Sequence, residues 1–150
     1  MRSIETASLQ SELATSCGTI ILNKEGQILL CHVTGMNFWD IPKGRMNPGE
    51  LPFQAAKREL FEETGLAFND ALFEELGGFK YQRNKRLHLY KLRAPETLSS
   101  LSHLRCTSYF SHQTTGISTP EMDGFRWASR TDIRVLCPFP MAECLLSLAW

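Results

Sequence analysis

The pattern of apolar runs and polar turn residues predicts a β-hairpin near the start of the chain. Two apolar runs, 17–22 and 28–33, flank the turn-forming tetrapeptide Asn-Lys-Glu-Gly at 23–26. Short β-branched runs are typical of strands, and a glycine between them can take the positive φ of a tight turn. The polar residues 1–16 are expected to form a leader before a domain that spans 17–150.

Helix-forming residues with the right end signals predict an α-helix over 52–64. Pro52 suits the first helical turn, and Gly65 suits the left-handed position after the last one. With about 100° between successive residues, one face is expected to pack and carries Phe53, Ala56, Leu60 and Thr64. A separate face presents the carboxylates of Glu59, Glu62 and Glu63.

Weaker patterns predict the other elements. Strands are expected at 72–79, 86–92 and 125–128, and helices at 131–136 and 141–150. The glycine- and proline-rich segment 34–52 is expected to be a shaped loop, as is the Ser/Thr-rich segment 95–119. A loop as long as the second is usually functional or mobile.

Composition and charge favour a soluble globular protein. The 150 residues are 43% hydrophobic and 21% charged, which is near the average for one folded domain. Sixteen basic and sixteen acidic residues cancel, so no overall field attracts a nucleic-acid duplex. No run approaches the roughly 20 apolar residues of a membrane span, and no signal peptide is evident. We expect a cytoplasmic monomer or homodimer without a membrane partner.

The cysteines do not indicate a metal or disulfide site. They are odd in number, widely scattered and without a CxxC pair, at Cys17, Cys31, Cys106, Cys137 and Cys144. This pattern disfavours a zinc site and a disulfide framework, and it fits reduced thiols. Since no histidine and acid partner is evident, nucleophilic cysteine chemistry is not expected.

Three glutamates on the predicted helix form a candidate metal site. Glu59, Glu62 and Glu63 stand at positions i, i+3 and i+4, where Cβ atoms are about 5–6 Å apart. Their charges repel unless a cation or Arg58 offsets them, and carboxylate oxygens suit Mg²⁺ or Mn²⁺. The alternative is the solvated charged face of an ordinary amphipathic helix.

The residues around this helix carry a family signature. From Gly44 the chain reads GRMNPGELPFQAAKRELFEETGL, which fits Gly-x5-Glu-x7-Arg-Glu-apolar-x-Glu-Glu-x-Gly-apolar at every specified position. The chain therefore resembles the Nudix hydrolase superfamily. The resemblance implies the α/β class, as a single-domain α/β/α sandwich with a mixed sheet, and a pyrophosphohydrolase that uses Mg²⁺ or Mn²⁺.

The resemblance also implies roles for motif residues. Metal ligands are expected at Glu59, Glu62, Glu63 and the carbonyl of Gly44, where a Cβ would obstruct a close approach. Metal-bound water is the expected nucleophile, with Glu62 the candidate general base. The expected catalytic residues are thus Glu62, Glu59 and Arg58.

Residues at the edges of the motif are expected to support the site. Arg58 is expected to brace Glu50 or a catalytic glutamate through a planar fork of donors, and Gly65 to end the helix. Further along, the segment 120–127 resembles a late acidic loop of the superfamily. It supplies another candidate metal ligand, Glu121, with Asp123 second, although a plain loop acid explains Glu121 equally well.

The candidate substrate contacts are Lys43, Arg45, Tyr81 and Tyr109. Lys43 can meet phosphate as a point charge, and a solvated lysine explains it equally well. Tyr81 belongs to a basic and aromatic cluster that could hold the phosphates or base of a substrate. A strand edge protected by charges explains this cluster better. Tyr109 is a candidate because it lies in the long irregular segment with Phe110.

The expected reaction is hydrolysis of a diphosphate bond in a small nucleotide diphosphate derivative. Dinucleoside polyphosphates, nucleoside triphosphates, nucleotide sugars, ADP-ribose-like compounds and capped RNA ends all stay open. Two alternatives use the same scaffold. An isoprenyl diphosphate isomerase would need a cysteine and acid pair that the sequence does not identify, and a ligand-binding Nudix module commonly has eroded carboxylates. The intact motif favours the hydrolase.

Overall fold

The computed structural model describes residues 14–150. Residues 1–13 of the predicted leader 1–16 therefore lie outside the described residues. The strands are β1 (Thr15–Leu22), β2 (Ile28–Val33), β3 (Trp39–Asp40), β4 (Lys43–Arg45), β5 (Glu74–Gln82), β6 (Lys85–Arg93), β7 (Tyr109–Ser111), β8 (Ser118–Pro120) and β9 (Met122–Ala128). The helices are α2 (Pro52–Thr64), α3 (Ile133–Leu136) and α4 (Phe139–Leu146), with 3-10 turns at Asp70–Leu72 and Arg130–Asp132.

The main sheet is mixed. Its strands follow the order β3-β2-β1-β6-β5, with β9 also paired to β2 and β4 also paired to β1. Among the strands of residues 14–150, β1 and β6 are the one parallel pair, and β1 and β2 form the predicted antiparallel hairpin. The early part of β1 pairs with β4, from Ser16↔Arg45 to Gly18↔Lys43, whereas its end pairs with β2 at Leu22↔Ile28. This split brings the glycine-rich segment onto the sheet next to α2.

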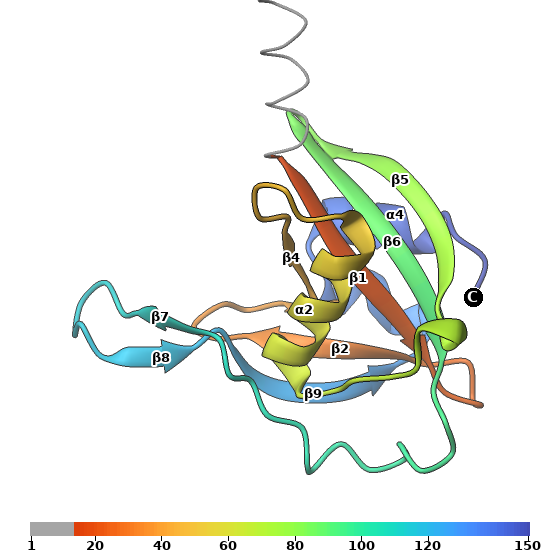
Figure 1. Ribbon diagram of the computed structural model, residues 1–150. Helices are drawn as coiled ribbons and strands as arrows, with labels where there is room; N and C mark the ends of the chain where they lie inside the picture. The colour runs from red at the N-terminus through yellow and green to blue at the C-terminus, as the bar shows by residue number, and fades with distance from the viewer. Residues whose placement is uncertain (1–13) are drawn as a thin grey trace, which may run out of the picture.

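Helices cover both faces of the sheet, which confirms the α/β/α sandwich. Alternate residues of β1 point to opposite faces. Ile20 and Leu22 pack in a core cluster with α3 and α4, whereas Ile21 packs with Leu60 of α2. Figure 1 shows α2 in front of β1 and β6, with α4 behind the sheet. None of the helices in 14–150 has the length and apolar character needed to cross a membrane.

Several element predictions need correction. The segment 95–119 was expected to lack regular structure, but it contains β7, whose partner β8 runs to Pro120. The segment 34–52 contains the short strands β3 and β4. The last helix runs over Phe139–Leu146 rather than 141–150, because Pro140 is tolerated in its first turn.

Candidate active site

Helix α2 places the motif glutamates because its opposite face is buried. Ala55, Ala56 and Leu60 are at most 1% exposed, and the two alanines let the helix approach β1 closely. Pro52 opens the helix, and Gly65 follows it with φ of 79° and a backbone N–H that donates to Phe61 O at 2.8 Å. The predicted end signals therefore operate as expected.

Arg58 connects the carboxylates of the motif. Its Nε and Nη2 donate to the two oxygens of Glu50 at 2.8 and 3.0 Å, which is a bidentate pair. Its Nη1 donates to Glu59 at 2.7 Å and to Glu62 at 3.1 Å. Nη2 also donates to the carbonyl of Arg45 at 3.0 Å. One guanidinium thus fixes α2 to the loop before it and offsets charge on three glutamates.

Glu63 is the most buried carboxylate of the site, with 2% of the residue exposed. Its Oε1 accepts a hydrogen bond from the backbone N–H of Lys43 at 2.8 Å. The pKa of Glu63 is raised to about 9, mainly by burial. The backbone N–H of Lys43 opposes this change, and the charges of Glu59 and Glu121 contribute to it. The positive charge of Lys43 favours the ionised form of Glu63, and a cation bound nearby would favour it further.

Glu59 lies directly against Gly44. A Cβ built at position 44 would overlap the carboxylate of Glu59, so only glycine fits there without movement. Burial raises the pKa of Glu59, while Arg58 opposes the change and the charges of Glu62 and Glu121 add to it. Glu59, Glu63 and Glu121 therefore share one electrostatic environment, although they come from α2 and from the β8–β9 junction.

Glu121 and Asp123, the two candidates from the late acidic loop, face different surroundings. The backbone of Glu121 donates to Ser108 O at 2.9 Å and accepts from Thr34 N at 3.0 Å. The Asp123 carboxylate instead lies 2.5 Å from Nδ1 of His32. Of the two, Glu121 is the one whose charge contributes to the raised pKa of Glu59 and of Glu63.

The structure does not bring all candidate substrate contacts together. The Lys43 ammonium lies 3.4 Å from the buried Asp40 carboxylate, beside the glutamates. Tyr81 is half-buried against the core on the α4 side of the sheet, and it lines a cavity of about 520 Å³ there. Tyr109 is 56% exposed on β7. Arg45 reaches the site through its carbonyl, which Arg58 contacts.

Two features of the site were missed by sequence reasoning. Asp40 is buried next to Lys43, and the only signal in the sequence is its spacing of three residues from that lysine. The second feature is the segment before β7. Its backbone caps the end of α2, since Thr107 N donates to Glu62 O at 2.7 Å and Arg105 N donates to Thr64 O at 3.0 Å.

Comparison with known proteins identifies the family of the chain. The NUDIX domain family model matches residues 12–143. The chain belongs to the Nudix family. An enterobacteria phage T4 protein of 17.7 kDa from the e-segB intergenic region is 38% identical over 125 residues, covering 77% of this chain and 82% of the phage protein. An RNA pyrophosphohydrolase from Pectobacterium atrosepticum is also 38% identical, covering 75% of this chain and 66% of that protein.

Solved structures share the Nudix fold. A C. elegans Ap4A hydrolase binary complex has a TM-score of 0.54 and 21% identity, covering 88% of this chain and 90% of that one. The NUDIX domain of Shewanella oneidensis NrtR, complexed with ADP ribose, has a TM-score of 0.61 and 14% identity, covering 89% and 83%. At the level of its family, the chain is a Nudix pyrophosphohydrolase that acts on phosphorus-containing acid anhydrides.

Proposed function

We propose that this Nudix protein hydrolyses a phosphoanhydride bond of a nucleoside polyphosphate with the help of Mg²⁺ or Mn²⁺. The observation that carries the proposal is the contact between Gly44 and Glu59. The Glu59 carboxylate lies where a Cβ of residue 44 would stand, so its oxygens lie close enough to the backbone of β4 for the two to share a ligand. The charge of Glu121 acts on the same carboxylates from the opposite segment.

The donor set fits a hard divalent cation. Glu59, Glu62, Glu63, Glu121 and the carbonyl of Gly44 would supply oxygen ligands only. Within residues 14–150, no three acidic, histidine or cysteine side chains already surround a common point. Arg58 now donates to Glu59 and Glu62, so these two carboxylates would turn from the guanidinium toward a cation.

Each residue of the site has a proposed task. When bound, the cation would offset charge on the phosphates and lower the pKa of a coordinated water. Glu62, whose side chain is 37% exposed, is the carboxylate of α2 with most access to that water and is our candidate to accept its proton. Arg58 holds the helix and Glu50 in place. The Lys43 ammonium, 3.4 Å from the Asp40 carboxylate, would contact the phosphates.

The substrate class is proposed from the relatives and from the charge of the chain. The relative named RNA pyrophosphohydrolase supports a 5′-polyphosphate end of RNA, and the fold shared with Ap4A hydrolase supports a dinucleoside polyphosphate. The zero net charge gives no attraction to a long duplex, so only the terminal nucleotides need to bind. We propose a nucleoside polyphosphate, free or at an RNA end, as the partner of a cytoplasmic enzyme that is a monomer or homodimer.

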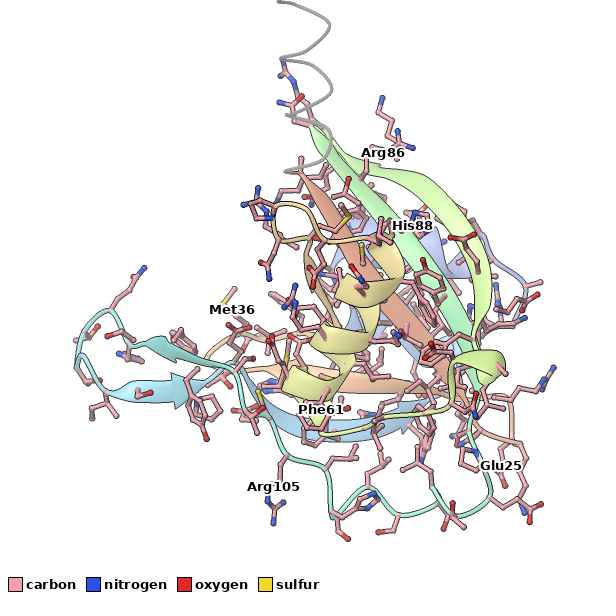
Figure 2. All side chains as sticks on the ribbon, in the orientation of Figure 1. Glu25, Met36, Phe61, Arg86, His88 and Arg105 are labelled. Carbon is pink, nitrogen blue, oxygen red and sulfur yellow. The ribbon has the colours of Figure 1, made fainter. Side chains whose placement is uncertain are left out.

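The test is a hydrolysis assay in which the products are separated by chromatography, on wild-type protein, Glu62→Gln and a control, Glu25→Gln, whose residue lies in the exposed 23–26 turn (Figure 2). The substrates are ATP, diadenosine tetraphosphate, ADP-ribose and a 5′-triphosphorylated RNA oligonucleotide. We expect turnover that requires Mg²⁺ or Mn²⁺, stops with EDTA and falls by a factor of about 100 or more in Glu62→Gln only.

Other outcomes would overturn the proposal. Tight nucleotide binding without turnover of any substrate would support a ligand-binding module instead. Conversion of isopentenyl diphosphate to a rearranged alkene with its diphosphate retained would support an isomerase.

A further inference from the structure

A small cavity lies beside Glu121, outside the group of carboxylates on α2. It has a volume of about 260 Å³ and is lined by Val33, Thr34, Phe110, Glu121 and Met122. Glu121 belongs both to this cavity and to the electrostatic environment of Glu59 and Glu63. A ligand that reaches the carboxylates therefore has this cavity next to it.

One wall of the cavity is Phe110 of the β7–β8 hairpin, which projects from the body of the protein near β2 and β9 (Figure 1). The base of the hairpin is fixed, because Glu121 N donates to Ser108 O at 2.9 Å and Thr34 N donates to Glu121 O at 3.0 Å. Successive side chains of a strand point to opposite faces. Phe110 faces the cavity, and Tyr109 accordingly points to the other side of β7.

The chemistry of the walls fits a flat and uncharged group. Val33, Met122 and the ring of Phe110 are apolar, and Phe110 remains 37% exposed. The hydroxyl of Thr34 is buried and has no hydrogen-bond partner among residues 14–150, so a ligand group that reached it would supply the missing bond. No residue from 107 to 120 is Asp, Glu, Lys or Arg. The hairpin thus offers the ring of Phe110 for stacking, Thr34 after β2 offers a hydroxyl, and Glu121 is the charged residue of the lining.

We propose that this cavity is a nucleobase subsite, in which Phe110 stacks on the base and the Thr34 hydroxyl bonds to its edge. The inference rests on the proposed function and specifies it, because it places the base on the β7–β8 side of Glu121 and the polyphosphate on the α2 side. A nucleobase has a flat face for stacking and polar edge atoms for hydrogen bonds, as this cavity requires. A phosphate in this cavity would find no Lys or Arg among the five lining residues to pair with its charge.

The test compares a substrate that has a base, ATP, with one that has none, inorganic tripolyphosphate. The variants are Phe110→Ala, Phe110→Trp and the control Ile117→Ala, which changes an exposed side chain of the same hairpin. We expect Phe110→Ala to raise KM for ATP about 10-fold to 100-fold with kcat nearly unchanged. The kinetics of Phe110→Ala with tripolyphosphate should match those of the wild type. Phe110→Trp keeps an aromatic ring and should have a KM for ATP near the wild-type value, and Ile117→Ala should match the wild type.

Equal losses on ATP and tripolyphosphate, or no change in KM for ATP, would overturn the subsite. Thr34→Val, which keeps the shape and removes the hydroxyl, should change the ranking of ATP, GTP, CTP and UTP. If the wild type turns over neither ATP nor tripolyphosphate, the proposed function fails on these compounds, and calorimetric titration with AMP decides the subsite separately. Weaker AMP binding in Phe110→Ala than in wild type supports it, and equal binding or none in the wild type refutes it.

Discussion

Gly44 of β4 lies directly against the carboxylate of Glu59 on α2, and a Cβ at position 44 would overlap that carboxylate. The atoms in conflict are the flexible end of one side chain, and no backbone atom is among them. Rotation of Glu59 would relieve the overlap without unfolding the protein. The glycine is therefore required for the position of the carboxylate more than for the fold.

Gly44→Ala should lower kcat/KM by a factor of about 100, because a shift of about 1 Å at a reacting group has effects of this size. Its thermal unfolding midpoint should remain close to that of the wild type. Gly18→Ala is the contrasting control, because its new Cβ would come 2.7 Å from Lys43 Cβ and 2.9 Å from the backbone oxygen of Pro42, which cannot rotate away as the end of a side chain can. That variant should lose about 1–3 kcal/mol of stability. Full activity in Gly44→Ala would contradict the proposed site.

Arg58→Lys tests the fork geometry of the guanidinium while it keeps the positive charge. A lysine cannot reproduce the bidentate pair with Glu50 together with bonds to Glu59 and Glu62. We expect about 1–3 kcal/mol of lost stability in urea unfolding and at least about 10-fold lower kcat/KM.

The neighbouring Lys57→Ala is the control for that experiment. Lys57 pairs with Asp70, and their side chains are 36% and 65% exposed. An exposed pair of this kind contributes less than about 1 kcal/mol. If Arg58→Lys behaved like Lys57→Ala, the guanidinium would act through its charge alone and the bracing role would be wrong.

Helix α2 and its carboxylates could be predicted because their signals are local. Pro52, Gly65 and the spacing of the glutamates lie within a short stretch, and their consequences follow from helix geometry. The resemblance implied that Arg58 braces Glu50 or a catalytic glutamate, and in the structure its guanidinium bonds to Glu50 and to Glu59 and Glu62.

Features that depend on distant contacts could not be predicted. Strand β7 has three exposed residues, so it lacks the apolar alternation that indicates a strand, and only its pairing with β8 defines it. The cap of α2 by Thr107 is a backbone contact across 45 residues, and no side-chain pattern records it. The burial of Asp40 likewise depends on packing around β3.

Asp132 should make stability depend on pH in the acidic range. Its carboxylate accepts from the backbone N–H and the hydroxyl of Ser129 at 3.2 and 2.9 Å, and these bonds lower its pKa below the usual aspartate value. A lowered folded-state pKa contributes stability that is present above the unfolded-state pKa and is lost as pH falls through the folded-state value. Asp132→Asn should therefore be less stable than wild type at pH 7.

The difference between Asp132→Asn and wild type should shrink once the pH falls below about 4. Urea unfolding across this range measures it, and Glu25→Gln controls for the loss of one negative charge on an exposed turn. A difference that stays constant from pH 7 to pH 3 would show that the cap does not depend on ionisation.

Arg130 should stabilise the C-terminal residues without affecting catalysis. Its Nη1 and Nη2 donate to Leu148 O at 3.0 Å and Leu146 O at 2.7 Å, and its guanidinium lies 4.7 Å from the ring centroid of Trp150. These contacts belong to the α4 face of the sheet, opposite α2. Arg130→Ala should cost about 1–2 kcal/mol and leave kcat/KM for ATP within about twofold of wild type.

A double-mutant cycle with Trp150→Ala separates the ring contact from the other bonds of Arg130. Residues in direct contact give a coupling free energy of about 0.5 kcal/mol or more, so the double variant should lose less than the sum of the single losses. Arg134→Ala is the control, because Arg134 and its partner Glu143 have side chains 60% and 48% exposed. Strict additivity of Arg130→Ala and Trp150→Ala would mean that the guanidinium acts only on the two carbonyls, and a loss of activity in Arg130→Ala would connect the α4 face to the site.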